Sequence, residues 1–428
     1  MFKIAKARER RRQDLGAVKF LKGEDGCVLV KEHDIKMRWQ GYFYNLFNDR
    51  RDYQQEIEEN DDSPTQRRLR NNGYCRRITR EEVRTNLRKM GRAKAVGPDN
   101  IPIEVWKCLG EEGVHWLTIL FNLIFKSGKM PDQWRNSVVV PVYKNKGDAQ
   151  CCGNYRGIKL LGHTMKLWER IIETRIRRET QVTVNQFGFM PGRSTTEAIH
   201  ILRRLMEKYK EKKRDLHMVF IDLEKAYDSV PRRLIWDSLE SRGVFGKYID
   251  LIRDMYVRTE TSVRAPVGDT DSFPVEVGHH QGSALSPFLF AVILDELTKL
   301  IQRALPWCLL FADDIVLVAD SKQSLNARLE EWRAALEGRG LKISRSKTEY
   351  LYCDFSGVDN DEDIQITIDS QVVPQVTKFK YLGSFVQRDG EIDSDVAHRI
   401  QVGWCRWRAA TGILCDKRFP KKIEREIL

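Results

Sequence analysis

The sequence lacks the features that mark membrane, secreted and zinc-binding proteins. No apolar run approaches the roughly 18 to 20 residues that cross a bilayer, and the opening stretch MFKIAKARERRR holds no apolar segment of a secretory signal. The nine cysteines form no C-x-x-C pair and no Cys/His cluster at zinc-finger spacing. We therefore expect an intracellular protein of the nucleus or cytoplasm, with no membrane partner and no cysteine-built metal site.

Histidine chemistry is also scarce. Only eight histidines occur, and they form no recognisable catalytic constellation. His279 and His280 are adjacent, and because successive strand side chains point to opposite faces, we interpret both as non-catalytic.

The composition favours a folded, nucleic-acid-binding protein. The chain has 428 residues, of which 41% are hydrophobic and 10% aromatic, which excludes wholesale disorder. Its formal net charge of +12 points to a polyanionic partner, nucleic acid before an anionic membrane. The alternative at this stage is a protein that is simply basic.

The pattern of apolar residues predicts a mixed α+β fold. Residues 137–143, SVVVPVY, and the stretch from Asn154 onward predict a β-hairpin, and residues 165–176 carry apolar residues at helical spacing. Ser194 and Glu197 match a helix capping box. Residues 217–221 and 309–318 predict strands, and alternating isoleucines from 364 to 368 predict one more.

Three aspartates carry the strongest chemical signal. Asp313 and Asp314 are adjacent between two apolar runs, and Asp222 ends another apolar strand. Burying such like charges together is costly unless a cation neutralises them. Oxygen ligands select Mg²⁺, with Mn²⁺ as the alternative, and three carboxylates suit the two-ion site of nucleotidyl transfer. The competing interpretation of Asp313 and Asp314 is a plain hairpin turn.

A series of motifs then resembles the reverse transcriptases of non-LTR (LINE-type) retrotransposons. The resemblance covers nearly the whole chain and implies a right-hand polymerase fold with an antiparallel palm sheet, helical fingers and the start of a helical thumb. In chain order the motifs are WRNSVVVPVYKNKGD, NYRGIKLLGHTMKLWERII, NQFGFMPGRSTTEAI, FIDLEKAYDSVPR, HQGSALSPFLFAVILDEL, FADDIVLVAD, GLKISRSKTEYL and KYLGSFV.

The resemblance implies a role for individual residues. Asp222, Asp313 and Asp314 match the metal-binding catalytic carboxylates, with Asp314 the less certain ligand. Tyr227 matches the bulky gate that excludes a ribose 2′-hydroxyl, against the alternative of core packing. The other implied nucleotide-binding residues are Lys144, Arg156, Gln281, Gly282 and Lys347, and the implied template and primer contacts are Arg193, Tyr381, Leu382 and Gly383. A plain solvated hairpin is the alternative for Lys144 and Arg156.

The resemblance also implies an organisation and a set of partners. We expect an N-terminal extension (1–76), fingers (77–216), a palm (217–386) and a partial thumb (387–428). The implied activity is RNA-directed DNA synthesis from an RNA template, a DNA primer and deoxynucleoside triphosphates. The endonuclease of such elements has no signature in this chain, and whether another protein supplies it stays open. The alternative function is a catalytically silent, nucleic-acid-binding remnant.

Overall fold

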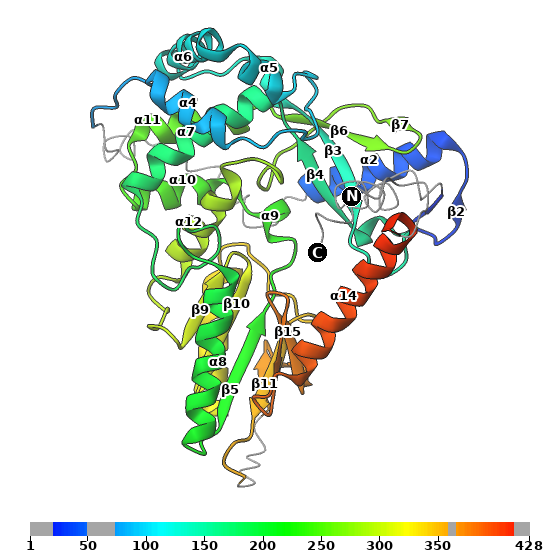
Figure 1. Ribbon diagram of the computed structural model, residues 1–428, viewed down its shortest axis with the longest axis vertical. Coiled ribbons are helices and arrows are strands. Elements are labelled where there is room, and N and C mark those ends of the chain that lie inside the picture. The colour runs from blue at the N-terminus through cyan, green and yellow to red at the C-terminus, as the bar shows by residue number, and fades with distance from the viewer. Residues whose placement is uncertain (1–19, 49–72, 358–364, 415–428) are drawn as a thin grey trace.

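The computed structural model describes residues 20–48, 73–357 and 365–414. Parts of the predicted extension (1–19 and 49–72), Ile364 and the end of the predicted thumb (415–428) lie outside the described residues. The rest forms a mixed α+β structure with two larger sheets, which confirms the expected fold class (Figure 1).

The first sheet has five strands in the order β14-β11-β5-β10-β9. Its neighbours pair antiparallel, as expected for a palm sheet, except that β14 at the edge runs parallel to β11. The strands are β5 (Leu216–Ile221), β9 (Cys308–Phe311), β10 (Asp314–Ala319), β11 (Glu349–Cys353) and β14 (Gln375–Val376).

Both faces of this sheet are covered, which explains the continuous apolar runs in its strands. Every residue of β5 is buried. Val219 and Ile221 join one core with Trp332 of α13 (Lys322–Glu337), whereas Met218 and Phe220 join another core with residues of α8 (Thr195–Glu211). A strand sandwiched in this way has no polar face to alternate with.

The second sheet belongs to the upper part of the molecule and has the order β4-β3-β6-β7, with β8 also paired to β6. The predicted hairpin is confirmed, because β3 and β4 pair antiparallel. The strands are β3 (Asn136–Tyr143), β4 (Tyr155–Leu160), β6 (Glu260–Ala265), β7 (Gly268–Asp269) and β8 (Phe273–Pro274). Strands β6 to β8 come from the range predicted as palm.

The helices cluster mainly around the second sheet and above the first (Figure 1). They are α2 (Glu32–Asn48), α4 (Arg80–Lys89), α5 (Ile103–Cys108), α6 (Gly110–Ser127), α7 (His163–Glu179), α9 (Ala226–Ser229), α10 (Arg232–Ser241), α11 (Gly246–Tyr256), α12 (Ser286–Thr298) and α14 (Asp393–Leu414), with 3₁₀ turns at Asp132–Arg135 and Cys152–Asn154. Helix α14 lies in the range predicted as a partial thumb, and it slants away from the first sheet in Figure 1.

The remaining strands form three small hairpins: β1 (Leu21–Lys22) with β2 (Val28–Leu29), β12 (Thr367–Ile368) with β13 (Gln371–Val372), and β15 (Lys378–Tyr381) with β16 (Ser384–Gln387). The strand predicted from the isoleucines is therefore short within the described residues, because only Thr367 and Ile368 pair.

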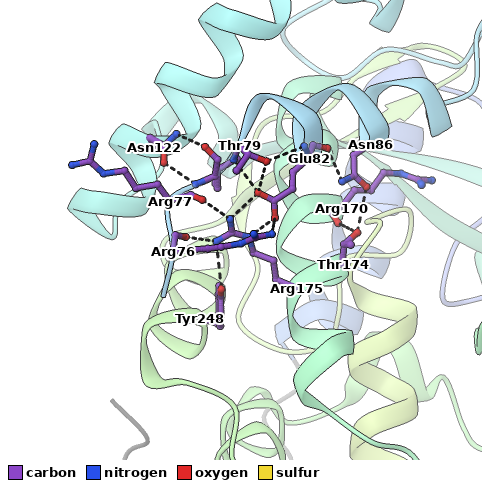
Figure 2. Close-up of polar contacts among 11 residues, drawn as sticks. Arg76, Arg77, Thr79, Glu82, Asn86, Asn122, Arg170, Thr174, Arg175 and Tyr248 are labelled. Carbon is purple, nitrogen blue, oxygen red and sulfur yellow. Dashed lines mark hydrogen bonds and ion pairs between the residues drawn. The ribbon is translucent and has the colours of Figure 1, made fainter. Parts of the chain in front are cut away.

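A buried ion pair fixes the upper helices to one another (Figure 2). The Arg175 guanidinium of α7 donates to both carboxylate oxygens of Glu82 in α4, each at 2.9 Å. It also donates to the carbonyls of Arg76 and Arg77 at 2.7 and 2.9 Å. The Glu82 carboxylate in turn accepts from the backbone of Thr79, completing a capping box at the start of α4.

None of the helices in the described part of the chain is both long enough and apolar enough to span a membrane.

Candidate active site

The three predicted aspartates lie at the same end of the first sheet. In the antiparallel pair of β5 and β10, Ile221 lies opposite Ile315. The next residue on each strand is Asp222 and Asp314, so these two side chains are neighbours, and Asp313 occupies the turn before β10. The structure therefore brings all three carboxylates together, as expected from the strand ends.

The turn that carries Asp313 is supported from a distant segment. The side-chain oxygen of Gln186 accepts from the Ala312 backbone N–H at 3.1 Å and from that of Gly188 at 2.8 Å. A Cβ on Gly188 would lie 2.3 Å from the Ala312 nitrogen, so only glycine permits this approach. Gln186 is a positioning residue that the sequence did not single out.

Negative charge at this end of the sheet is poorly compensated. Burial, followed by the charge of Asp222, raises the pKa of Asp313. Burial and then the charges of Asp313 and Asp222 raise the pKa of Asp314 to about 6. Asp222 has a cation beside it, because the Lys347 ammonium donates to Asp222 Oδ1 at 3.0 Å.

This donor set fits a divalent cation in chemistry. The carboxylates supply only oxygen ligands, and two of them carry charge that the surroundings disfavour, which a bound cation would relieve. The three carboxylates do not form a complete coordination site, since the described residues hold no group of three His, Cys, Asp or Glu side chains at metal-binding geometry. Lys347 currently supplies the positive charge at Asp222.

A cavity of about 820 Å³ opens beside these carboxylates. It lies between the β3–β4 hairpin, helix α2 and the segment 222–228. Its lining includes Asp222 and Asp313 and five of the predicted nucleotide-binding residues, namely Lys144, Arg156, Tyr227, Gln281 and Lys347.

Cations gather in this cavity. Lys144 follows β3, and Arg156 is an exposed residue of β4, so the hairpin presents both. Burial lowers the pKa of Lys144, and the charges of Lys347, Arg156 and Lys225 lower it further. Four positive groups that repel one another around an open cavity favour a polyanionic ligand.

Tyr227 forms part of the cavity wall. Its ring stacks on Phe290 with centroids 4.5 Å apart and is half-buried. The described residues offer its buried hydroxyl no hydrogen-bond partner. Burial raises the pKa of this hydroxyl, and the charge of Asp313 raises it further, so the group stays neutral. The ring rather than the hydroxyl is therefore fixed by its surroundings.

Gln281 and Gly282 are clamped against the β3–β4 hairpin. The Gln281 side-chain amide donates to Asp228 Oδ2 at 3.1 Å, and the Gln281 backbone carbonyl accepts from the Lys159 N–H at 2.7 Å. Gly282 has a φ of +107°, and a Cβ there would lie 2.5 Å from the Lys159 carbonyl oxygen. Gly282 thus permits close approach of two backbones and is not itself among the residues lining the cavity.

Buried polar groups surround this clamp. The Lys159 ammonium lies 4.0 Å from the Phe47 ring centroid, and neither it nor Asp228 Oδ1 has a hydrogen-bond partner among the described residues. His279 and His280 are also buried, and burial lowers the pKa of both. Both imidazoles are neutral, and both pack against the Tyr256 ring. Residues 278–281 are not a strand, so the expectation that the two side chains point to opposite faces is wrong.

The predicted template and primer residues lie outside the 820 Å³ cavity. The Ser194 side chain accepts from the Glu197 N–H, which is one of the two hydrogen bonds of the expected capping box. The Glu197 carboxylate does not make the second one and instead forms an ion pair with Arg193. Tyr381 is buried and lines a separate small cavity with Asp222 and Asp314.

Leu382 and Gly383 form the turn between β15 and β16, with φ values of 47° and 87°. A Cβ on Gly383 would meet none of the described residues within 4 Å, so glycine suits this position because of the left-handed turn and not because another group approaches closely.

The residues of the cavity wall that sequence reasoning missed include Tyr42 and Leu46 from α2, and Lys225 from the segment after β5. Lys225 sits inside a recognised motif, but nothing in the sequence indicates that residues of the N-terminal extension lie beside it.

A larger groove of about 1130 Å³ lies elsewhere, against α6 and the segment before α4. Its lining contains Arg77, Arg80, His115 and Lys126 but no carboxylate. It therefore offers no carboxylate ligand for a Mg²⁺ ion, and the smaller cavity remains the candidate active site.

Comparison with known proteins agrees with this assignment. The family profile described as "Reverse transcriptase (RNA-dependent DNA polymerase)" matches residues 143–386, more than half of the chain. The chain belongs to this family.

Its relatives include polymerases of non-LTR retrotransposons, which confirms the resemblance seen in the motifs. A Pol polyprotein from the type-1 retrotransposable element R2 of Nasonia vitripennis is 25% identical over 350 residues, 77% of this chain and 34% of the relative. A probable RNA-directed DNA polymerase from transposon BS of Drosophila melanogaster is 28% identical over 329 residues, 71% of this chain and 35% of the relative. The chain spans about a third of the length of these relatives.

Among solved structures, an apo telomerase from Candida tropicalis, truncated from its C-terminal domain, aligns with a TM-score of 0.42 and 15% identity. The alignment covers 64% of this chain and 59% of that structure.

Proposed function

We propose that this protein is an RNA-directed DNA polymerase that transfers deoxynucleotides to the 3′-hydroxyl of a DNA primer on an RNA template. The observation that carries the proposal is the meeting of Asp222, Asp313 and Asp314 at one end of the first sheet, where Asp222 and Asp313 line a cavity that Lys144, Arg156, Lys225 and Lys347 also line. Membership of the reverse transcriptase family and the names of the relatives support it.

In this proposal Asp222 and Asp313 hold two Mg²⁺ ions, with Asp314 as a further ligand and Mn²⁺ as an alternative ion. When bound, such ions activate the primer hydroxyl and neutralise the leaving pyrophosphate. Lys347 bonds only Asp222 Oδ1, so an ion at Oδ2 would share this carboxylate with Lys347 and an ion at Oδ1 would displace it. This ion pair is partly exposed and hence worth little, so such a displacement is inexpensive.

The other residues bind and orient the nucleotide. Lys144 and Arg156 hold the triphosphate by charge-assisted hydrogen bonds. Lys347, once free of Asp222, lies on the side of the departing pyrophosphate. Gln281, held by Asp228, supports the new base pair, and Gly282 lets its loop sit tightly on β4. The Tyr227 ring excludes a ribose 2′-hydroxyl by contact.

The template and primer would extend from the cavity along the palm. We assign template contact to Arg193 and primer contact to the Tyr381–Leu382–Gly383 turn. In the same proposal residues 77–216 are fingers, 217–386 palm, and 387 onward the start of a thumb. A location in the nucleus or cytoplasm remains a prediction from the sequence, and the resemblance leaves open whether another protein supplies a nuclease.

Primer extension tests the proposal. Purified protein is given a DNA primer annealed to an RNA template, deoxynucleoside triphosphates and Mg²⁺. We expect extension by the wild type, loss of extension in Asp313→Asn with an unchanged melting curve, and full activity in Asp320→Asn, which changes an exposed carboxylate just beyond the other end of β10.

A second measurement separates the silent remnant from the polymerase. The +12 charge predicts that log affinity for an RNA–DNA hybrid falls linearly with log salt. Salt-dependent binding without extension would support the remnant. A flat salt response would exclude both interpretations.

A further inference from the structure

Helix α2, from the predicted N-terminal extension, is built into the second sheet. Its residues Ile35, Trp39, Phe43 and Phe47 recur every four positions and are all buried. They pack with residues of β3, β4 and β6 in one apolar cluster. The Phe47 carbonyl accepts from the Glu276 and Val277 N–H groups at 3.1 and 3.0 Å.

This anchoring turns the neighbouring face of α2 toward the candidate active site. Tyr42 and Leu46 are one helical turn apart and half-buried, and both line the cavity that contains Asp222 and Asp313. Tyr44 on the same helix points elsewhere: it is exposed, contacts Phe273 at 5.9 Å between ring centroids, and does not line the cavity.

Tyr42 faces a cation that the sequence did not single out. The Lys225 ammonium lies 5.6 Å from the centroid of the Tyr42 ring, within the range of a cation–π interaction. Lys225 lies three residues beyond Asp222, lines the same cavity and has a φ of 47°, so its backbone is held in a tight left-handed turn.

The positive charge of Lys225 adds to that of the other cations that line the cavity. Its charge, with those of Lys347 and Arg156, acts on Lys144. An exposed lysine on a flexible stem samples many rotamers, and contact with a fixed aromatic face restricts them. The ring therefore favours rotamers that keep the ammonium in the cavity before any ligand binds.

We propose that Lys225 binds the phosphate groups of the incoming nucleoside triphosphate and that Tyr42 is its positioning residue, which makes α2 part of the nucleotide site. This inference deepens the proposed function and rests on it for the identity of the nucleotide. Tyr42 acts through Lys225 and does not take part in the chemistry.

Steady-state primer extension with separate kcat and KM for the deoxynucleotide tests this inference. Lys225→Met, which keeps the stem and removes the charge, is expected to raise KM roughly tenfold to a hundredfold, the size of a lost hydrogen bond to a charged group. Tyr42→Leu is expected to raise KM about three- to thirtyfold. In both, kcat and the affinity for primer–template change by less than about threefold.

Two matched variants separate positioning from structure. Tyr42→Phe keeps the ring and is expected to retain the wild-type KM, whereas Tyr44→Leu on the exposed face of α2 changes neither kcat nor KM. If Tyr42→Leu instead lowers kcat and melting temperature together while KM stays constant, Tyr42 is a packing residue and the inference is wrong.

A binding measurement keeps this test independent of polymerase activity. Inorganic tripolyphosphate is titrated into each protein by calorimetry. Weaker binding in Lys225→Met and Tyr42→Leu, with wild-type binding in Tyr44→Leu, supports the inference even if no protein extends a primer, in which case only the proposed function fails. Equal binding by all variants, or none by the wild type, overturns the inference.

Discussion

Replacing Tyr227 separates the two roles of its ring and its hydroxyl. The ring stacks on Phe290 and borders the cavity, whereas the buried hydroxyl has no hydrogen-bond partner among the described residues. Leaving a buried polar group unpaired costs about 1 to 3 kcal/mol. Tyr227→Phe is therefore expected to keep or slightly increase stability and to leave sugar selection unchanged.

Tyr227→Val removes the ring and should change both properties. Cutting a fully buried aromatic side chain to alanine costs about 3 to 5 kcal/mol, and the cost for Tyr227→Val is smaller because Tyr227 is half-buried and valine keeps part of the side chain. If the ring excludes the 2′-hydroxyl with a clash of about 3 to 4 kcal/mol, its loss raises the relative efficiency with ribonucleotides by roughly 10² to 10³. The assay is the ratio of kcat/KM for ribo- and deoxynucleotides in each variant.

Tyr350→Val provides the control for lost packing. Tyr350 is a buried tyrosine of β11 in the first sheet, its hydroxyl bonds the His217 ring at 2.7 Å, and it does not line the cavity. The Tyr350→Val variant should have lower stability than the wild type and an unchanged ratio of kcat/KM for ribo- and deoxynucleotides. If Tyr227→Val behaves in the same way, Tyr227 is a core residue and the steric gate is refuted.

Two further predictions concern the supports of the site. Gly282→Ala should destabilise the fold by about 1 to 3 kcal/mol and abolish primer extension. The added Cβ would lie 2.5 Å from the Lys159 carbonyl oxygen, and the backbone φ is +107°. A melting temperature equal to that of the wild type in thermal denaturation would contradict this prediction. Arg175→Met should cost about 3 to 5 kcal/mol in urea denaturation, since it breaks a buried ion pair; a cost below about 1 kcal/mol would show that water replaces the guanidinium. Burial alone would raise the pKa of Glu82, but hydrogen bonds from Arg175 and Thr79 outweigh it and lower that pKa. The contribution of this ion pair to the free energy of unfolding is thus complete above about pH 4.5 and is lost as the pH falls through the lowered pKa of Glu82. The free energy of unfolding, measured from about pH 6 to 3, should therefore fall less steeply in Arg175→Met than in the wild type.

The elements closest to the chemistry were largely predictable. Apolar runs predicted the strand that ends just before Asp222 and the strand that begins at Asp314, because strands buried on both faces have no polar alternation to obscure them. The hairpin of residues 137–160 and the helix around 165–176 were also predictable, from β-branched residues and from helical spacing.

Predictions of local structure failed where a side chain or backbone group bonds to a different partner from the one that the local sequence pattern indicates. Glu197 should have completed a capping box, but Arg193 binds its carboxylate instead. We treated His279 and His280 as successive strand residues, yet residues 278–281 form a loop, in which the Gln281 side chain donates to Asp228 and the Gln281 backbone carbonyl accepts from the Lys159 N–H. No local pattern reveals such partners.

The sequence alone determined the chemistry of the site: three carboxylates at strand ends, the surrounding motifs and the positive charge that points to nucleic acid. Side-chain type and short-range spacing carry that information. Only the tertiary structure decided which groups share the cavity. Tyr42 meets Lys225 because the buried face of α2 packs on the second sheet, and this contact between distant segments depends on how the two surfaces fit rather than on any local pattern.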